Sequence, residues 1–371
     1  MNREFLQLAH VFTEKHSPGG WFLSEKLDGM RAFWDGGVTR GIPCRGIPFA
    51  NVEKHSRFLV EKVSSGLWSR YGQPIAAPEW WLDSLPPMLL DGELYAGRGR
   101  FQFVMSTCKD HEASEDWREI KYHVFDSPSL EYWLSDGKIN NTNFKKNFKS
   151  FGSWFQELPR FPRLTPRMLT TTSFESVQKL LITIMTQNRQ WTVHPQIQLP
   201  LGHDAAIQEI NLQLNRITDL GGEGVMLKKR ESKWTPYRTY ELLKVKKFLD
   251  SEAIVIGYTS GRATDKGSKL LGMMGNMIVQ WGSKQFELSG FTDEERHLGC
   301  SKAAHFTDEF NMKGCPDEDA REWARKNAGR ELPLWAECMT FPRGSKVTFR
   351  YRELSDDGIP KEARYWRKRN E

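Results

Sequence analysis

The sequence predicts an α+β domain in residues 1–247, followed by a small β-barrel in residues 248–371. The length of 371 residues suits two domains that each bury an apolar core. The first part mixes helix-forming patterns with short strand-forming runs, which is typical of α+β domains. In the second part, short strand-forming runs alternate with glycine-containing turns, which is typical of small barrels.

The first domain is expected to contain both strands and helices. Residues 18–48 alternate short apolar pieces with Gly and Pro, a pattern of strands and turns. Two later segments carry apolar residues three to four positions apart, which predicts amphipathic helices. One contains Phe174, Val177, Leu181 and Ile184 with Ser173 as N-cap, and the other contains Ile207, Ile210, Leu214 and Ile217 and ends at Gly221 and Gly222.

After Lys247 the sequence changes to short runs rich in β-branched and aromatic residues. Residues 300–343 interrupt this pattern with many charged side chains, and Ala320, Trp323 and Ala324 predict a helix inside this insertion. The predicted strands are 252–258, 275–281, 285–288 and 346–352.

The composition is that of an ordinary globular protein. Hydrophobic residues make up 39% and charged residues 27%, and the net charge of +6 permits a polyanionic partner without requiring one. The N-terminus lacks the basic-then-apolar pattern of a secretory signal, and no apolar run reaches membrane-spanning length. We therefore expect a soluble protein without a membrane partner, located in the cytoplasm, or in the host cytoplasm or nucleus if it is viral.

The five cysteines are an odd number and form no C-x-x-C pair. This argues against a disulfide framework and suits a reducing compartment. Cys300, Cys315 and Cys338 lie near His297 and His305, but their spacing matches no standard zinc module.

The segment Ser24–Arg31 contains the most informative pattern, Lys-x-Asp-Gly-x-Arg. A lysine side chain has a reference pKa near 10.4, so forming the nucleophilic amine at pH 7 costs about 4.6 kcal/mol unless neighbouring cations lower that pKa. Arg31 supplies such a cation near Lys26, which makes Lys26 a candidate nucleophile. Because Asp-Gly is also a common turn dipeptide, a surface turn is the alternative for this motif alone.

Two further pairs of charged residues are spaced to share one face of a strand. Asp91 and Glu93 would face one pocket together, and so would Lys244 and Lys246. Two ammonium groups in one pocket repel each other unless an anion such as a triphosphate lies between them, and they would help Lys26 to lose its proton. The alternatives are a solvated acidic edge and a lysine-rich edge strand.

Five segments together resemble, in order and spacing, the nucleotidyltransferase motifs of ATP-dependent DNA ligases. The likeness is greatest to the small ligases of bacteria, phages and large DNA viruses, and it extends from about residue 21 to residue 369. It implies a nucleotidyltransferase (adenylation) domain followed by an OB-fold. The segments are Lys26–Arg31, Leu90–Leu94, Tyr122–Asp126, Glu223–Lys228 and Leu242–Lys246.

The resemblance implies a reaction in three steps. Lys26 attacks the α-phosphate of ATP and forms lysyl-AMP, the adenylate moves to the 5′-phosphate of a nick, and the 3′-hydroxyl displaces AMP. The implied cofactors are ATP and Mg²⁺, with Mn²⁺ possible because oxygen ligands serve both ions. The implied partner is nicked double-stranded DNA, bound by a monomer during replication, repair or recombination.

The resemblance also implies roles for individual residues. Glu93 would contact the ribose or a metal-bound water, Phe125 would stack on adenine, and Glu223 would bind the metal together with Glu93. Lys244 and Lys246 would contact the α-phosphate and take part in catalysis.

The resemblance also implies roles for several arginines. Arg31 would be catalytic and would contact the nucleotide. Either Arg40 or Arg45 would contact the nucleotide sugar or the nicked strand. Arg367, spaced to share a strand face with Arg369, would contact the cofactor.

Related activities remain as alternatives. An RNA ligase or RNA-repair ligase shares this catalytic domain, and a GTP-dependent capping guanylyltransferase shares the lysine motif and the OB domain. A barrel directly after Lys246 favours DNA ligase over most RNA ligases. A nucleic-acid-binding module with an inactive pocket is disfavoured, because all five motifs retain their reactive side chains.

Overall fold

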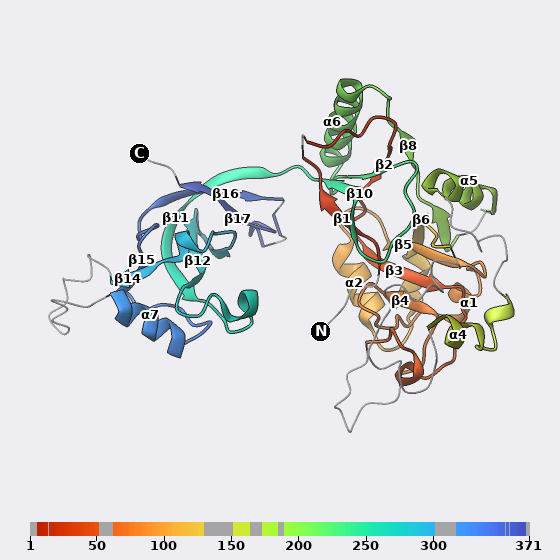
Figure 1. The fold of residues 1–371 in the computed structure, drawn as a ribbon, viewed down its shortest axis with the longest axis horizontal. Helices are drawn as coiled ribbons and strands as arrows, with labels where there is room; N and C mark the ends of the chain where they lie inside the picture. Colours follow the sequence, from red (N-terminus) through yellow and green to blue (C-terminus); the bar gives the residue numbers. More distant parts are fainter. Residues whose placement is uncertain are drawn as a thin grey trace. The chain divides into compact units, whose positions relative to one another are not determined.

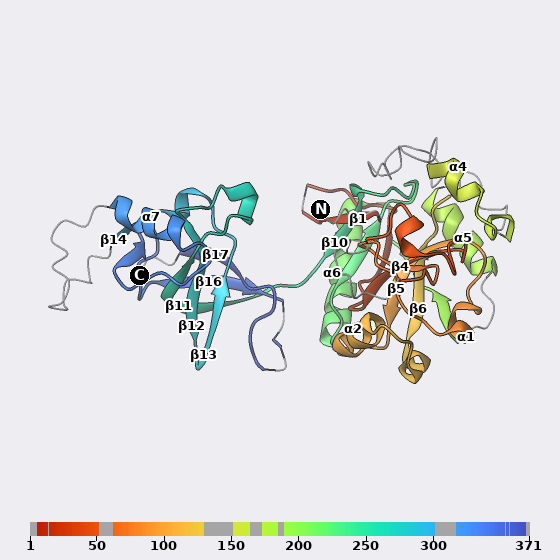
Figure 2. The same ribbon diagram turned by 90° about the horizontal axis from the view of Figure 1, so that it is seen from below.

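The chain was analysed as a computed structural model that describes residues 6–368 except for 14, 52–61, 130–150, 164–172, 185–188, 301–316, 353 and 356. It divides into two compact units, Met1–Lys246 and Lys247–Glu371, called here the N-terminal and C-terminal units. Figures 1 and 2 show the elements of each unit. Within the described ranges, no helix is both long enough and apolar enough to cross a membrane.

Two five-stranded sheets form the N-terminal unit, with the strand orders β1-β10-β9-β2-β8 and β4-β3-β5-β6-β7. Neighbouring strands are antiparallel except for β1 with β10 and β6 with β7, which are parallel. The strands of the first sheet are β1 (Leu8–Val11), β2 (Phe22–Glu25), β8 (Ile197–Gln198), β9 (Val225–Lys228) and β10 (Arg238–Val245). Those of the second are β3 (Met30–Asp35), β4 (Leu67–Ser69), β5 (Leu89–Tyr95), β6 (Lys121–Asp126) and β7 (Trp191–Val193).

Both helices predicted by apolar spacing are confirmed. Helix α5 (Phe174–Ile184) buries Phe174, Val177 and Leu181, and the Ser173 hydroxyl accepts a hydrogen bond from the Ser176 N–H at 3.4 Å. Helix α6 (His203–Asp219) buries its apolar face against the first sheet. The other helices of this unit are α1 (Glu79–Leu82), α2 (Phe101–Lys109) and α4 (Phe151–Gln156), with 3-10 turns at Cys44–Gly46, Glu115–Glu119 and Phe161–Arg163.

The second sheet of the N-terminal unit is covered by apolar residues on both faces. Trp81 and Trp117 belong to the core on the side of α1, α2 and α5, and their rings meet edge to face at 4.9 Å. Phe33, Trp68 and Phe155 belong to the core on the opposite side. Several of the many tryptophans therefore serve packing, and the sheet is a rigid support for whatever its edge residues bind.

The C-terminal unit contains a five-stranded antiparallel sheet of order β13-β12-β11-β16-β17 and a separate β14-β15 pair. Ser289, just after β13, makes a single parallel bridge to Arg364 at the start of β17. Within the described ranges this bridge is the only pairing between the ends of the two edge strands, so the five-stranded sheet of the predicted small barrel is not continuously closed. The strands are β11 (Leu249–Ser260), β12 (Met274–Trp281), β13 (Lys284–Leu288), β14 (Leu298–Cys300), β15 (Ala336–Cys338), β16 (Lys346–Tyr351) and β17 (Arg364–Lys368).

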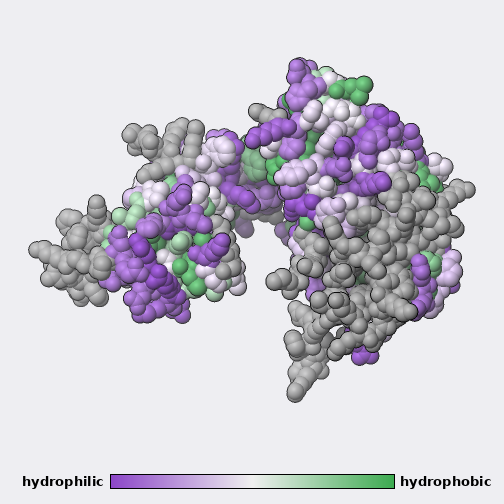
Figure 3. Space-filling model, viewed as in Figure 1, coloured by the Kyte–Doolittle hydropathy of each residue, from purple (hydrophilic) through white to green (hydrophobic). Residues whose placement is uncertain are grey.

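The helix predicted within residues 300–343 is confirmed as α7 (Asp317–Lys326), whereas residues 301–316 lie outside the described part. Ala320 and Ala324 face the core of the C-terminal unit, and the charged residues of α7 form a hydrophilic patch in Figure 3. The remaining regular pieces are 3-10 turns at Asp265–Ser268 and Glu294–Arg296.

The cysteines differ from the sequence expectation at one position. Cys44, Cys108 and Cys338 are buried free thiols, but Cys300 is disulfide-bonded. Within the described ranges, no three histidine, cysteine, aspartate or glutamate side chains are grouped so that they could hold a metal ion.

Asp35, at the end of β3, leads to a prediction about stability and pH. It is fully buried, and one carboxylate oxygen accepts hydrogen bonds from the Thr39 hydroxyl and from the Trp68 indole N–H. Burial raises the pKa of Asp35 from 3.8 to about 6, although these hydrogen bonds oppose the shift. Because the folded state holds this proton more tightly than the unfolded state, the contribution of Asp35 to stability is lost as the pH rises through about 6.

We therefore expect Asp35→Asn to flatten the dependence of unfolding free energy on pH between pH 5 and pH 7. Denaturant unfolding followed by tryptophan fluorescence measures this slope for both proteins. Asp83→Asn, at an exposed position, is the matched control and should keep the wild-type slope. Identical slopes for Asp35→Asn and wild type would contradict the prediction.

Candidate active site

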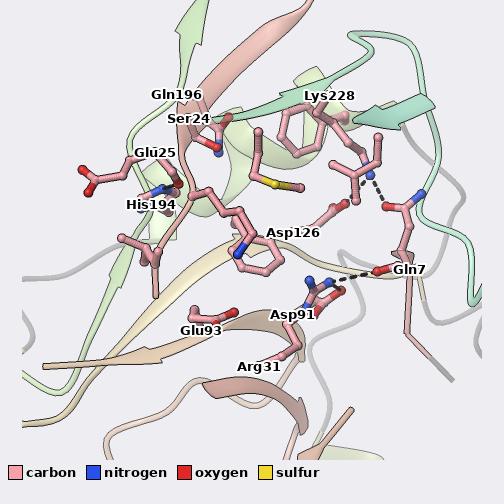
Figure 4. A pocket seen from close by; sticks show the side chains of 16 residues that line it. Gln7, Ser24, Glu25, Arg31, Asp91, Glu93, Asp126, His194, Gln196 and Lys228 are labelled. Atoms are coloured by element: carbon pink, nitrogen blue, oxygen red, sulfur yellow. Dashed lines mark hydrogen bonds and ion pairs between the residues drawn. The ribbon is translucent and has the colours of Figure 1, made fainter. Parts of the chain in front are cut away.

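A pocket of about 660 Å³, including its open mouth, lies between the two sheets of the N-terminal unit. Strands β2, β3, β5, β6, β9 and β10 all contribute to the sixteen residues that line it (Figure 4). Of the residues predicted from sequence, those that line the pocket are Lys26, Arg31, Asp91, Glu93 and Phe125.

The Glu223 carboxylate holds two lysines side by side. Its Oε2 is 2.5 Å from the Nζ of Lys26, and its Oε1 is 2.8 Å from the Nζ of Lys246. The Glu223 side chain is only 3% exposed and that of Lys246 only 9%, whereas Lys26, which lines the pocket, is 25% exposed. The structure thus brings together three predicted residues that are far apart in sequence.

The electrostatics of this cluster follow from the position of the carboxylate. Burial alone raises the pKa of Glu223, but the charges and hydrogen bonds of Lys26 and Lys246 outweigh burial and lower it. The sequence predicted an anion such as a triphosphate between Lys244 and Lys246; in the structure, the Glu223 carboxylate instead lies between Lys26 and Lys246. A phosphate group that entered the pocket would meet lysines already held in place.

Glycine at position 224 allows the approach of the strands that carry these residues. Gly224 has φ +151°, and a Cβ atom there would lie 2.3 Å from the carbonyl oxygen of Val245. A side chain would therefore push β9 away from the end of β10 and separate Glu223 from Lys246. The Lys26 N–H also donates to the Gly224 carbonyl at 2.8 Å, which ties the nucleophile candidate to the same segment.

Arg31 is held against Phe125 by a buried carboxylate. Both oxygens of Asp91 accept hydrogen bonds from the Arg31 guanidinium at 2.7 Å, and the Trp234 indole N–H donates to Asp91 at 2.7 Å. The guanidinium lies 4.4 Å from the centre of the Phe125 ring. Asp91 thus orients Arg31, which in turn covers one side of the aromatic residue that was predicted to stack on a base.

Glu93 lies beside Asp91 on β5, as strand alternation predicts. Burial raises the pKa of Glu93 to about 7, while Lys26 and Arg31 partly oppose the shift. The negative charge of Glu223 adds to the rise in the pKa of Glu93, and Lys26, which contacts Glu223, opposes it. Two carboxylates are a usual protein contribution to a Mg²⁺ site whose remaining ligands come from phosphates and water.

Lys228, Asp126 and Gln7 form a second charged group in the pocket that sequence reasoning did not single out. The Lys228 Nζ is 3.0 Å from Asp126 Oδ2 and also donates to the Gln7 side-chain oxygen. Lys228 and Asp126 lie inside quoted motifs, and their burial could not be read from residue type. Gln7 carried no signal, because only the parallel pairing of β1 with β10 brings it to the pocket.

Other predicted residues are not brought to this pocket. The Arg40 guanidinium pairs with Glu79 and with Asp83, and Arg45 is exposed in a 3-10 turn, so neither lines it. Lys244 lies on β10 opposite Met226 and is not among the lining residues. Arg367 belongs to β17, but its side chain lies outside the described part, as does Arg369.

The Asp91–Arg31 pair allows a direct test of this geometry. We expect Asp91→Ala to lower the free energy of unfolding by about 3–5 kcal/mol, because it leaves a mostly buried guanidinium without its counter-charge. Asp83→Ala removes an exposed carboxylate from Arg40, which keeps its pair with Glu79, and should cost at most about 1 kcal/mol. Denaturant unfolding measures both, and equal costs would show that the Asp91 pair is not a buried structural contact.

Comparison with known proteins agrees with this architecture. No protein-family model matches the chain. A protein of Haemophilus influenzae named DNA ligase is 22% identical over 367 residues, which cover 98% of this chain and 92% of that protein. A solved structure from a study of DNA binding by Lig E DNA ligases is 24% identical, covers 98% of both chains and has a TM-score of 0.61.

A second solved structure, named Pmar-Lig_PreS3, shares the fold at 19% identity and a TM-score of 0.56, covering 98% of this chain and 67% of that one. The likeness to both structures includes the N-terminal and the C-terminal unit. It agrees with the order of the five motifs and with the similarity to the Haemophilus protein over 98% of this chain. The chain is thus similar over almost its whole length to a protein named DNA ligase, and it shares the fold of a Lig E DNA ligase structure.

Proposed function

We propose that this protein seals nicks in double-stranded DNA, using ATP through a covalent lysyl-AMP intermediate, and that it acts as a monomer. The observation that carries the proposal is the cluster of Lys26, Glu223 and Lys246 at a pocket that also contains Phe125 and Arg31. An amine, a second cation and an aromatic ring around one cavity suit the α-phosphate and the base of a nucleotide.

In the first step, the Lys26 nitrogen attacks the α-phosphorus, a nitrogen–phosphorus bond forms, and the bond to the β-phosphate oxygen breaks, so that pyrophosphate leaves. The lysine must lose a proton before it attacks, and the Glu223 carboxylate already accepts a hydrogen bond from that nitrogen. Lys246, on the other oxygen of the same carboxylate, is placed to stabilise negative charge that develops on the phosphate.

Two further displacements complete the proposed reaction. An oxygen of the 5′-phosphate at the nick attacks the adenylate phosphorus, and the Lys26 nitrogen leaves. The 3′-hydroxyl then attacks the 5′-phosphate, the phosphodiester bond forms, and AMP leaves. Each step is a transfer at phosphorus, for which a protein mainly supplies position and charge neutralisation.

Glu93 and Glu223 would hold Mg²⁺, or Mn²⁺ in its place. Their oxygen atoms suit either ion. Within the described ranges no third carboxylate, histidine or cysteine completes a closed metal site, which suits an ion whose other ligands belong to the triphosphate. When bound, the ion would neutralise charge on the phosphates.

The C-terminal unit is proposed to be an OB-fold that contacts the DNA. Its five-stranded antiparallel sheet and the bridge between Ser289 and Arg364 support a partly open barrel. The 2.8 Å hydrogen bond from the Tyr365 N–H to the Ser289 carbonyl brings the ends of the sheet together. Such barrels bind nucleic acids largely through contacts to the phosphate backbone of the nucleic acid, so the affinity for DNA should weaken steeply with added salt.

Incubation with labelled ATP or GTP, followed by nicked DNA or nicked RNA, tests the proposed function. We expect label to be retained from ATP and nicked DNA to be sealed. Lys26→Ala should abolish labelling, because it removes the attacking nitrogen. Lys246→Ala should slow labelling on the order of a hundredfold, because it removes one charge that stabilises the transition state.

Lys229→Ala is the matched control for these substitutions. Lys229 pairs with Glu241 at the surface and does not line the pocket, so labelling should keep the wild-type rate. Labelling from GTP alone, or sealing of RNA without sealing of DNA, would overturn the proposed function.

A further inference from the structure

The peptide group that joins Glu25 to Lys26 is held at both of its polar atoms. The Lys26 N–H donates to the Gly224 carbonyl at 2.8 Å. The Glu25 carbonyl accepts a hydrogen bond from the Nε2 of His194 at 2.8 Å. The backbone that carries the proposed nucleophile is therefore fixed from two directions, by β9 on one side and by a histidine side chain on the other.

The register of the sheet explains why a side chain is needed at this point. Strand β2 pairs with β8 at Phe22 with Gln198 and at Leu23 with Ile197. Continuing this register brings Glu25 opposite Pro195, which has no backbone N–H to donate. The His194 imidazole supplies a donor where the ladder cannot, next to the nucleophile.

His194 also connects the two sheets that form the pocket. It follows β7 of the second sheet, and its backbone N–H donates to the Val124 carbonyl at 2.7 Å. Its side chain reaches Glu25 on β2 of the first sheet, and Figure 4 shows the two residues next to each other at the pocket wall. The position of Lys26 is thereby coupled to β6, the strand that carries Phe125.

The chemistry of the contact fixes the protonation of the ring. A carbonyl oxygen only accepts, so Nε2 carries a proton. His194 is 5% exposed, and its burial lowers its pKa although the bond to Glu25 opposes the shift, so the imidazole is neutral at pH 7. Its Nδ1 is buried without a hydrogen-bond partner within the described ranges. The bond to Glu25 is therefore the one specific polar contact described for this ring.

We propose that His194 is a positioning residue for nucleotidyl transfer, which holds the Glu25–Lys26 backbone so that the Lys26 nitrogen meets the α-phosphorus. This inference rests on the proposed function. Glu25 is restrained on its side chain as well, since Arg98 binds both carboxylate oxygens at 2.9 Å. Removing the imidazole would free the one carbonyl that β8 cannot bind, and small displacements of reacting atoms cost large factors in rate.

His123 offers a matched control. It is another largely buried histidine with an unpartnered Nδ1, and its ring meets that of His194 at 5.7 Å. It does not line the pocket, and its described contacts are with Tyr95 and His194. His123→Ala removes an imidazole of the same size from a neighbouring position without removing the bond to Glu25.

The test compares two reactions that differ in their need for Lys26. One is the single-turnover rate of AMP transfer to the enzyme at saturating ATP, and the other is the sealing of a nick that already carries the 5′-adenylate. We expect His194→Ala to slow the first on the order of a hundredfold, with little change in the apparent KM for ATP. Sealing of the adenylated nick should change less than threefold, because Lys26 is not the nucleophile in that step.

Two substitutions should restore the lost rate. His194→Gln places an amide N–H near the Glu25 carbonyl and should recover most of it. In the His194→Ala background, Pro195→Ala supplies a backbone N–H opposite Glu25 and should recover part of it. His123→Ala should transfer AMP within threefold of the wild-type rate.

The inference is overturned by any of three results. These are AMP transfer by His194→Ala at the wild-type rate, a loss of AMP-transfer rate in His123→Ala as large as that in His194→Ala, or an equal loss by His194→Ala in AMP transfer and in sealing of the adenylated nick. Should His194→Ala fail to fold, His194→Gln decides: a wild-type thermal midpoint with a rate near wild type supports the hydrogen bond, and a hundredfold loss overturns it. If the wild-type protein acquires no AMP, the proposed function itself fails. If the wild type and His194→Ala acquire AMP at the same rate, only the role of His194 fails.

Discussion

One carboxylate, that of Glu223, holds the site together. It separates Lys26 from Lys246, which would otherwise repel each other, and it holds both ammonium groups together next to the pocket that Lys26 lines. Because the carboxylate is buried, the pair of cations is also what keeps it ionised. The site is therefore ordered before a nucleotide enters, and an anionic phosphate would replace or join a carboxylate rather than assemble the site.

The fold forms the site from residues of two sheets, which both line the pocket. Lys26 and Glu223 come from the first sheet, and Asp91, Glu93 and Phe125 come from the second. The close backbone contact at Gly224 connects β9 with the end of β10, next to Lys26. The hydrogen bond from His194 to Glu25 connects the second sheet with the first at the same point. The chemistry thus depends on packing that lies outside the reactive residues, and the well-filled cores on both faces of the second sheet keep that packing rigid.

Much of the fold could be predicted from sequence where local patterns decide the structure. Helices α5, α6 and α7 and strands β11, β12, β13 and β16 follow local sequence patterns, whereas β14, β15 and β17 were not predicted. Asp91 and Glu93 share a pocket because strand alternation requires it. What could not be predicted depends on pairing between distant segments. Gln7 reaches the pocket because β1 pairs in parallel with β10. His194 bonds to the Glu25 carbonyl at the point where the β2–β8 register, if continued, meets Pro195. Arg40 forms ion pairs with Glu79 of α1 and with Asp83 at the C-cap of that helix.

The account stands on Lys26 as the residue that carries the nucleotide. Mass spectrometry of peptides from protein incubated with ATP and Mg²⁺ tests this most directly. The account predicts the mass of one AMP on the peptide that contains Lys26, released when nicked DNA is added. An adduct on Lys244 or Lys246, or a wild-type protein that gains no mass, would contradict it.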